Sequence, residues 1–575
     1  MPLQEVQIPD FLGGIDSANP PFSLRENRGV RVEGLSPIRG RLTSDTGYQQ
    51  FLGTVRGDPQ LVQQFYKKDG SSELILITTQ TGYKRLGNQW AYLPTDVQTT
   101  LSAAASANDT VLSVNSTAGF SVGDYVGIGL DDGTEHQSTI SAIGTGTITI
   151  ADPMPGPANT GNYVNQALAL TGDLDNPVSF VTMPAVDYFI FTNYNDPVKY
   201  YDGQKCVTLP GLPTGNDRCR AVALFNNYLF LLSTIEGGQA YPQRVRWSDT
   251  GDPTTWTSGN AGFVDLYDSE DFITAAAPLG PYLMIYRERS IIRCEYLGAT
   301  EQLFSFEQVI AGEGAMSVDS IADMGDMHLF VGNSNVYRYT GGFSIEPVGD
   351  PIYYTTFSVD GDMNPAYRHR VFAIYVEELD EVWIFYPAGS KTVPDRCLRY
   401  SQSLGSWFLR KFPEEFAGFG FYQKDISTTW ANLTGAWDSE SRQWGSRAFL
   451  SSSPTTLLCS YTNKRVMEYD YIAADDNGTA IAFLFEGKDF QFGEKRGRID
   501  HLEIAHAGPS ATVEYSTDRG QTWNTMGTLP ASGEITRTRL YKQVLCREFR
   551  FRVSGSGSGF ILAWAAIRYY EDAPY

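Results

Sequence analysis

Paired cysteines and long apolar runs are missing from this sequence of 575 residues. Its six cysteines lie far apart, with no C-x-x-C pair and no cluster with histidine, which argues against a zinc site. They are typical of small apolar core residues in a protein made in a reducing compartment: Cys206, Cys219, Cys294, Cys397, Cys459 and Cys546. No apolar segment reaches 18 residues, and the opening MPLQEVQIPDFLGG has no signal-peptide pattern. We therefore expect synthesis inside a cell and no membrane-spanning segment.

Helical periodicity and positive charge are also scarce. No long stretch repeats its apolar residues every 3.6 positions, so helix should be rare. The chain has 66 acidic and 44 basic residues and a net charge of −22. Proteins that hold nucleic acid by its phosphates need clustered Lys and Arg, so tight binding of nucleic acid is not expected. The acidity serves solubility, or it lines a channel wall that lets DNA pass by repelling it.

Recognisable catalytic motifs are missing as well. The sequence has no G-x-S-x-G elbow, no G-x-x-x-x-G-K-[ST] phosphate loop and no H-E-x-x-H helix. His501 and His506 are five residues apart in a predicted strand, so they should point to opposite faces; the other three histidines, His136, His328 and His369, are isolated. We therefore predict no catalytic, cofactor-binding or metal-binding residues and no enzymatic activity.

Three partial motifs bear on that prediction. STDRGQTW, from Ser516 to Trp523, fits the Asp box of sialidases, and WSDTGDPTTW, from Trp247 to Trp256, is a looser version. In such a box the Asp caps backbone N–H groups, Gly takes the strained position and Trp packs beneath. A glycosidase would also need a pocket that combines an arginine cluster, a Tyr nucleophile and acids.

The third partial motif places Asp360, Asp362 and Asn364 at alternate positions, like the first half of an EF-hand loop. The sixth position is Pro365 rather than Gly, and the twelfth is Val371 rather than Glu. These departures favour a solvated turn over a calcium site, and cation binding by the three residues stays an open question.

Aromatic residues and glycine are abundant instead. Aromatics make up 13% of the chain, with 33 Tyr and 32 Phe, and there are 56 Gly, a composition typical of strands joined by tight turns. An aromatic hairpin pattern recurs seven times, starting at positions 83, 198, 245, 291, 336, 398 and 465. Apolar runs precede six of the copies, within 73–80, 187–194, 227–234, 281–288, 327–334 and 381–388. Four-strand units repeating every 40 to 50 or so residues are typical of propeller blades.

We therefore predict an all-β fold, a β-propeller of six or seven blades carrying an inserted small β-barrel knob and a C-terminal β-sandwich. The spacings from 338 to 399 and from 399 to 467 are longer than the three steps from 199 to 338 and imply extended loops. The expected parts are an N-terminal segment joining the propeller, a first blade, the knob, the remaining blades and the sandwich: 1–60, 61–98, 99–168, 169–473 and 474–575.

The opening of the chain resembles tail and head–tail stabilisation proteins of tailed bacteriophages. Gly13, Gly14, Ile15 and Asp16 match their GG-[IL]-[ND] segment, and Gly40, Arg41, Leu42 and Gly47 match a following G-x-[LI]-x-x-x-x-G segment. The stretch Thr43–Thr46 departs from the usual basic pair and Pro. Arg244 to Gly262 is similar to a blade strand of the same proteins, and the C-terminal run is similar to their closing sandwich.

The resemblance implies a structural virion protein of a short-tailed phage, a tail nozzle, tube or adaptor made in the host cytoplasm. Such proteins form rings, often hexamers, that contact portal or adaptor proteins and tail fibres or tip. They retain packaged double-stranded DNA and conduct it during ejection without binding it tightly. Two alternatives share the fold: a carbohydrate-binding or carbohydrate-cleaving propeller, and a host-adhesion or protein-binding scaffold.

Overall fold

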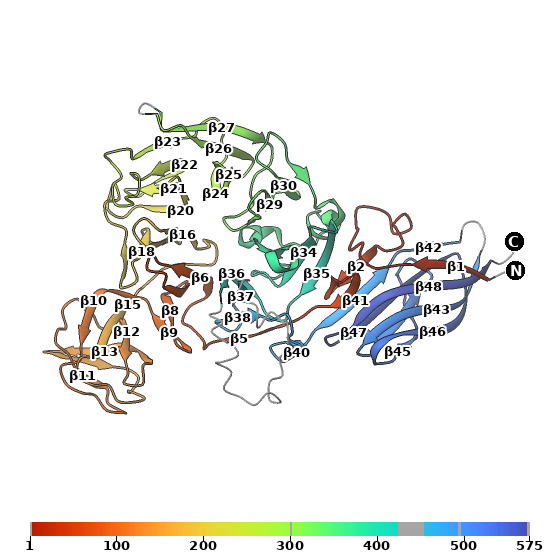
Figure 1. The fold of residues 1–575 in the computed structure, drawn as a ribbon, viewed down its shortest axis with the longest axis horizontal. Coiled ribbons are helices and arrows are strands. Elements are labelled where there is room, and N and C mark those ends of the chain that lie inside the picture. The colour runs from red at the N-terminus through yellow and green to blue at the C-terminus, as the bar shows by residue number, and fades with distance from the viewer. Residues whose placement is uncertain (1–2, 300–301, 424–453, 493–495, 572–575) are drawn as a thin grey trace.

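The computed structural model describes residues 3–299, 302–423, 454–492 and 496–571, and these form an almost purely β protein (Figure 1). The helical segments among them are short: η1 (Asp350–Ile352), α1 (Tyr353–Thr356), η2 (Pro365–Arg370) and η3 (Glu377–Leu379). The predicted all-β propeller class is confirmed. The helical segments occupy the long 338–399 spacing, whereas the 399–467 spacing lies partly outside the described residues.

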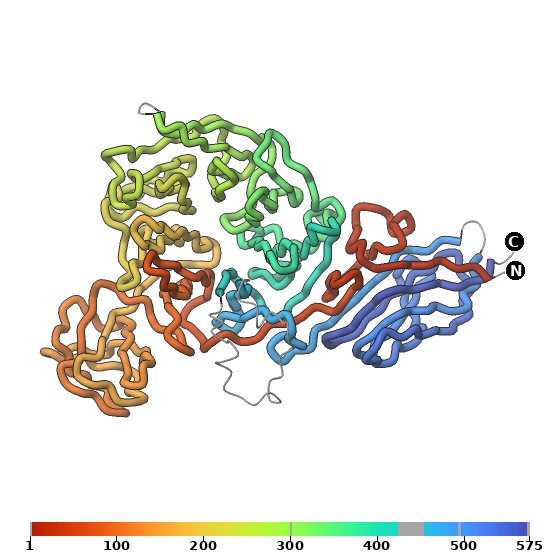
Figure 2. The backbone as a smooth tube through the Cα atoms, in the orientation of Figure 1, coloured from red at the N-terminus to blue at the C-terminus, as the bar shows by residue number. Residues whose placement is uncertain are grey.

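Seven four-stranded antiparallel units follow one another around a ring in the described chain (Figure 2). The first three are β6 (Pro59–Tyr66), β7 (Ser72–Thr78), β8 (Gly82–Leu86) and β9 (Gln89–Tyr92); β16 (Ser179–Met183), β17 (Tyr188–Thr192), β18 (Lys199–Tyr201) and β19 (Cys206–Thr208); and β20 (Arg218–Phe225), β21 (Tyr228–Glu236), β22 (Gln239–Trp247) and β23 (Gly262–Asp265). The next three are β24 (Ile273–Leu279), β25 (Tyr282–Arg287), β26 (Ser290–Tyr296) and β27 (Phe304–Ala311); β28 (Ile321–Asp323), β29 (His328–Val331), β30 (Val336–Tyr339) and β31 (Glu346–Pro347); and β32 (Phe372–Val376), β33 (Glu381–Tyr386), β34 (Arg396–Ser401) and β35 (Ser406–Lys411).

The sequence pattern maps onto these units in a regular way. The apolar runs form the second strand of each of these six units, and four of the aromatic hairpins form the third and fourth strands. The copy that begins at Val245 differs, because its fourth strand is β23 and the residues from Asp249 to Trp256 form a loop. The second strands are buried on both faces because each blade packs against two neighbours.

The seventh unit closes the ring by combining three strands within residues 416–469 with one strand from the N-terminal segment. It contains β36 (Phe416–Tyr422), β37 (Thr455–Ser460) and β38 (Arg465–Tyr469), and its fourth strand is β5 (Tyr48–Phe51) from the N-terminal segment. Strand β5 pairs antiparallel with β38, so Val466 lies opposite Phe51. The predicted hairpin at 465 therefore finds its partner strand about 400 residues earlier in the chain.

Two glycines allow the seventh unit to join the first. Strand β36 also pairs with β6, in parallel, across Phe419–Leu61 and Phe421–Gln63. A Cβ atom at Gly420 would lie 1.3 Å from the carbonyl oxygen of Val62, and one at Gly418 would lie 1.7 Å from that of Gln60. Only glycine permits this approach of two backbones.

The inserted knob comprises β10 (Pro94–Thr100), β11 (Val111–Ser113), β12 (Tyr125–Gly129), β13 (Glu135–Gly144), β14 (Thr147–Ile150) and β15 (Tyr163–Ala167). These strands form one six-stranded sheet around their own core of Leu101, Ile128, Ile148 and their neighbours. The knob starts at Pro94, five residues before the predicted boundary, and projects from the ring beside the first blade (Figure 1).

The sandwich is built from both termini, so the expected role of residues 1–60 was partly wrong. Strand β5 of that segment is a blade strand of the propeller, and β3 (Leu35–Ile38) pairs with β4 (Arg41–Ser44), whereas β1 (Leu3–Ile8), β2 (Gly29–Glu33) and β4 pair with C-terminal strands. Those are β41 (Ala482–Gly487) and β48 (Ile561–Glu571), accompanied by β42 (Phe490–Gln491), β43 (Gly497–Gly508), β44 (Ala511–Ser516), β45 (Asn524–Leu529), β46 (Ser532–Cys546) and β47 (Glu548–Ser556). Local sequence could not reveal this, because strand pairing over some 500 residues leaves no local signal.

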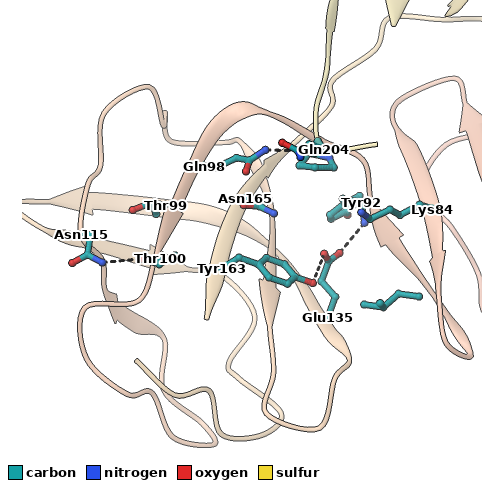
Figure 3. Close-up of a pocket in the computed structure, with 12 residues that line it drawn as sticks. Lys84, Tyr92, Gln98, Thr99, Thr100, Asn115, Glu135, Tyr163, Asn165 and Gln204 are labelled. Atoms are coloured by element: carbon teal, nitrogen blue, oxygen red, sulfur yellow. Dashed lines mark hydrogen bonds between the residues drawn. The ribbon is translucent and has the colours of Figure 1, made fainter. Parts of the chain in front are cut away.

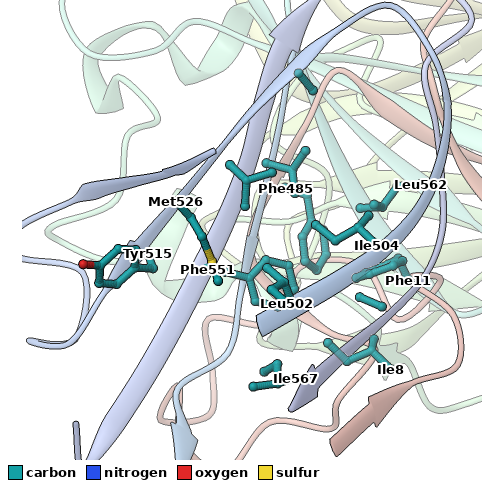
Figure 4. Close-up of a cluster of buried hydrophobic side chains, with 14 of the residues drawn as sticks. Ile8, Phe11, Phe485, Leu502, Ile504, Tyr515, Met526, Phe551, Leu562 and Ile567 are labelled. Atoms are coloured by element: carbon teal, nitrogen blue, oxygen red, sulfur yellow. The ribbon is translucent and has the colours of Figure 1, made fainter. Parts of the chain in front are cut away.

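The two sheets of the sandwich enclose a large apolar core, in which Ile8 and Phe11 from the N-terminal segment pack among Phe485, Leu502 and Ile567 (Figure 4). Burial of this size is the main favourable term for such a domain. One of the sheets continues into the propeller, because β2 pairs with β35 of the sixth blade on one side and with β41 on the other. The short strands β39 (Asp475–Asp476) and β40 (Thr479–Ala480) extend the closing blade beside it.

A buried network of ion pairs joins the N-terminal segment, the sixth blade and the segment after the propeller at this junction. The Asp45 carboxylate, between β4 and β5, lies 2.5 Å from Arg399 Nη1 and 3.2 Å from Arg410 Nη1. Arg399 also contacts Glu381 at 2.6 Å, and Arg410 contacts Asp476 at 2.7 Å. Their side chains are at most 5% exposed. The network therefore ties the N-terminal segment and the segment after the propeller to the sixth blade.

Replacing Gly420 by Ala should destabilise the closed ring by about 1–3 kcal/mol or more, since the new methyl group must push β36 away from β6. Thermal unfolding measures the loss. Gly53→Ala is the matched control, because a Cβ atom there meets nothing within 4 Å. Equal midpoints for the two variants would contradict this interpretation of the closure.

Replacing Asp45 by Asn should cost about 3–5 kcal/mol of unfolding free energy, because it leaves two buried guanidinium groups short of a counter-charge. Denaturant titration gives the value, with Asp96→Asn on the exposed knob surface as the control. A loss below about 1 kcal/mol would show that the network is dispensable.

Candidate functional site

The axis of the propeller holds a small cavity of about 160 Å³. Residues at or next to the innermost strands line it, including Gln60, Phe180, Val222, Asp319 and Phe419. At roughly 30 Å³ per water molecule, this volume corresponds to about five waters. The axis of a single subunit is therefore filled by side chains and has no room for a nucleic acid duplex.

One end of the axis is tied across by an ion pair. Asp175, in the segment that enters the second blade, accepts a hydrogen bond of 2.9 Å from Arg370 Nε at the entry to the sixth blade. His369 Nε2 lies 2.8 Å from the same carboxylate oxygen. These bonds lower the pKa of the Asp175 carboxyl group, so it stays charged at neutral pH. Leu174, Pro177 and Arg370 line a very small space at this end together with Asp319.

Asp319 is an unusual acid in this setting. Within the described part of the chain, its carboxyl group makes no hydrogen bond or ion pair, while its backbone carbonyl accepts from the Ala373 N–H at 2.8 Å. Burial raises the pKa of Asp319 to about 7. Gln60 Oε1 in the same cavity is also buried without a hydrogen-bond partner. The cavity is polar enough to hold ordered water.

A larger groove of about 520 Å³ lies between the knob and the first blade (Figure 3). Its polar lining includes Lys84, Gln98, Asn165 and Gln204. Glu135 on β13 lies at its wall, where it accepts hydrogen bonds from the Tyr92 N–H at 2.8 Å and from the Tyr163 hydroxyl at 3.2 Å. Burial raises the pKa of the Glu135 carboxyl group. These bonds attach the knob to the outer strand of the blade.

The chemistry of this groove does not fit hydrolysis of a glycosidic bond. Glu135 is the one acid among the described residues that line it, and no arginine is among them. Most glycosidases need two carboxyl groups across the scissile bond, and the sialidase arrangement needs an arginine cluster and a Tyr nucleophile.

A second groove, of about 640 Å³, lies between the knob and the second blade and is lined by Asp96, Asp124 and Lys199 among others.

Both Asp boxes are turn-forming structures. Asp518 accepts from the Ser516 hydroxyl at 2.6 Å and from the Thr522 N–H at 2.9 Å, which lowers its pKa to about 2. Gly520 has φ +84°, the left-handed conformation expected of the box glycine. Trp523 is half-buried, and the Arg552 guanidinium lies 4.2 Å from the centre of its ring.

The looser box in the third blade works in the same way. Asp252 accepts from the Thr254 N–H at 2.9 Å and from the Thr255 hydroxyl at 2.8 Å. Trp256 is buried in the core between the second and third blades. Both motifs therefore stabilise loops.

The residues of the EF-hand-like segment do not converge. Asp362 pairs with Arg396, Asn364 accepts from the Ala366 N–H at the start of η2, and Asp360 is exposed. Groups of three or more His, Cys, Asp or Glu side chains that could hold a metal ion are absent from the described ranges.

The histidines and cysteines take structural positions. His501 lies opposite the exposed Tyr541, whereas His506 lies opposite the buried Leu562, so the two point to opposite faces as predicted. His328 is buried against the Tyr286 hydroxyl at 2.8 Å, His136 lies 3.0 Å from the Asp152 carbonyl oxygen, and His369 joins the axial ion pair. All six cysteines are buried free thiols, which confirms their expected place in the core.

The phage-like motif residues lie where the N-terminal segment passes between propeller and sandwich. Gly14 has φ +67°, and a Cβ atom there would lie 2.5 Å from the Trp407 carbonyl oxygen of the sixth blade. A Cβ atom at Gly47 would lie 1.7 Å from the Asp475 carbonyl oxygen. Asp16 caps the following turn through the Ala18 N–H, Gly13 N–H bonds to the Asn27 carbonyl, and Ile15 N–H bonds to the Trp407 carbonyl. Gly40 turns the β3–β4 hairpin, which places Arg41 at the surface and Leu42 in the core.

Comparisons with known proteins identify no family: no family model and no curated protein matches the chain. Among solved structures, it is similar to the computationally designed Ika8 protein at 11% identity and TM-score 0.32, over 74% of this chain and 100% of that one. The calcium-binding protein regucalcin from Agrobacterium tumefaciens gives 13% identity and TM-score 0.27, over 42% and 77%. An exo-beta-1,3-galactanase from Phanerochaete chrysosporium gives 9% identity and TM-score 0.21, over 81% and 100%. Similarities this distant carry no functional argument.

No helix in the described ranges has the length and apolar character needed to cross a membrane.

Replacing Asp319 by Asn should flatten the pH dependence of stability. Because its pKa rises from 3.8 to about 7 on folding, the folded chain binds more protons between those values, and stability falls as pH rises through that window. The variant should therefore unfold a few degrees above the wild type at pH 8, with the difference vanishing near pH 4. Thermal scans across pH test this, with exposed Asp326→Asn as control. Parallel curves for Asp319→Asn and wild type would refute the raised pKa.

Proposed function

We propose that this chain is a structural protein of a short-tailed phage tail, a nozzle, tube or adaptor subunit. Copies of it assemble into a ring whose central channel retains the packaged genome and conducts it during ejection. The ring joins portal or adaptor proteins and tail fibres or tip in the virion, and the chain performs no catalysis.

The observation that carries the proposal is the position of the phage-like N-terminal motif. Two of its glycines, Gly14 and Gly47, lie at the close backbone contacts with Trp407 and Asp475, where the two large domains are joined. A motif with this role belongs to the architecture, in keeping with a structural protein. The continuous sheet through β2 and the buried Asp45 network support a rigid body suited to repeated packing.

The filled axis of the propeller restricts where DNA could travel. A cavity of about 160 Å³ cannot admit a duplex, so a DNA channel has to lie between subunits. The net charge of −22 supports a channel wall that repels phosphate, because each basic contact is multiplied by the number of copies in a ring.

The test is electron microscopy of the purified chain over a range of concentrations, alone and with tail partners. We expect rings with a central hole and negligible binding of double-stranded DNA at physiological salt. A strictly monomeric particle under every condition would refute the proposal.

A glycan-binding propeller is the second candidate, favoured by the amide and tyrosine side chains of the groove in Figure 3. Screening of a glycan panel for binding and turnover separates the two. Two results together would favour glycan binding as the function: glycan binding that is lost in Asn165→Ala, and a wild-type chain that forms no rings.

A further inference from the structure

One face of the sandwich has an unusual composition, with large exposed side chains on its outer strands beside nearly buried residues on its interior strand β43. In the sheet of β46, β43, β48 and β1, Leu502, Ile504 and Ile567 point into the apolar core (Figure 4). Side chains alternate along a strand, so Glu503, Ala505 and their cross-strand partners point the other way. We call this side the outer face.

The outer face is arranged in rows that the strand register defines. Directly opposite residues form the rows Arg537–Ala505–Trp564, Arg539–Glu503–Ala566, Tyr541–His501–Arg568 and Leu545–Arg498–Tyr570. Glu5 of β1 extends the third row and Leu3 the fourth. Tyr541 is 64% exposed, Leu545 47% and Leu3 43%. The face thus combines arginine and aromatic residues with exposed aliphatic ones.

Contacts within the face hold its side chains in place. The Arg537 guanidinium lies 4.7 Å from the centre of the Trp564 ring, and the rings of His501 and Tyr541 are 5.0 Å apart. Glu503 Oε2 lies 3.4 Å from Arg539 Nε and 3.8 Å from an Arg568 nitrogen, yet it is buried without a hydrogen bond. Preorganised Arg, Trp and Tyr side chains are those that dominate binding energy at protein interfaces.

The position of the face also favours docking. Strand β46 is 15 residues long, lies at the edge of its sheet and is mostly exposed. On an edge strand, prevention of unwanted strand pairing is by itself a sufficient explanation for charged side chains. Here, however, the same composition continues over the interior strands β43 and β48, where that explanation does not apply.

The knob has complementary properties. Residues 94–167 contain no Lys or Arg and seven acids. Asp109, Asp131, Asp132 and Asp152 are exposed in its turns. The knob and the sandwich lie at opposite ends of the long axis of the molecule (Figure 1), so a knob cannot reach the outer face of its own chain.

We propose that the outer face binds the acidic knob of a second copy of this chain, an inference that rests on the self-association in the proposed function. Such a contact joins two different surfaces, and repetition of a heterologous contact closes a ring when the rotation per subunit permits. Four strands about 4.8 Å apart and some 30 Å long present on the order of 600 Å². That is most of the roughly 800 Å² per partner in a standard interface.

The experiment uses two variants of the full chain. One reverses the outer face with Arg537→Glu and Arg539→Glu. The other neutralises four of the seven knob acids with Asp109→Asn, Asp131→Asn, Asp132→Asn and Asp152→Asn, and each Asn keeps one side-chain oxygen that can accept the turn hydrogen bond. Light scattering and electron microscopy should show association weakened at least tenfold in each. The paired controls Arg289→Glu and Asp326→Lys, both exposed on the propeller, should assemble like the wild type.

Mixing the two variants gives the sharper result. The face-reversed chain keeps an intact knob and the neutral-knob chain keeps an intact face, so one productive contact remains. We expect dimers of the two variants and no rings. Circular dichroism of each variant checks that it is folded.

The outcomes separate this inference from the proposed function. Rings that form equally well from the face-reversed chain would overturn the knob-to-face contact and leave the tail proposal standing. Wild-type chain that never associates would refute the tail proposal, and the contact with it. Double-stranded DNA binding that is lost in the face-reversed chain while its rings persist would assign the face to DNA and overturn the inference.

Discussion

The carboxylate of Asp45 forms the buried ion pairs on which the junction between propeller and sandwich depends. It lies between the last N-terminal strand of the sandwich and the strand that closes the propeller, and it meets two arginines of the sixth blade in a buried site. Buried charges cost free energy unless each is paired. Glu381 and Asp476 complete the pairing, and burial raises the pKa of Asp476 to about 6 even beside Arg410. The network therefore anchors the segment around Asp45 and the segment around Asp476 to the sixth blade.

Closure of the propeller ring depends in turn on the anchoring of the segment around Asp45. Strand β5 completes the seventh blade only because the preceding residues are held against the sixth, and β36 reaches β6 only because Gly418 and Gly420 lack side chains. Closure by strands from both ends joins the first and last blades by backbone hydrogen bonds. The same N-terminal segment then continues as part of the sandwich, so propeller and sandwich form one connected β-structure through β2.

The functional proposals rest on the scarcity of catalytic side chains in the described pockets and on two surfaces of unusual composition. The axis is filled and tied by the Asp175–Arg370 pair, and the groove beside the knob is lined by one acid among its described residues. The distinctive features lie outside: a knob without basic residues and a sheet face rich in arginine and aromatic rings. We propose that recognition between copies uses those surfaces, and that DNA passes through a channel that many copies form together.

The sequence by itself determined the blades, because alternating apolar runs and glycine turns act over a few residues and each unit buries its second strand locally. The Asp boxes, the buried cysteines and the opposite faces of His501 and His506 followed from the same short-range rules. The place of residues 3–44, the partner of β38 and the rows of the outer face were decided only by the tertiary structure. Their pairings join residues up to 567 positions apart, as for Leu3 and Tyr570. Register across such distances is set by the whole packed core and not by local pattern.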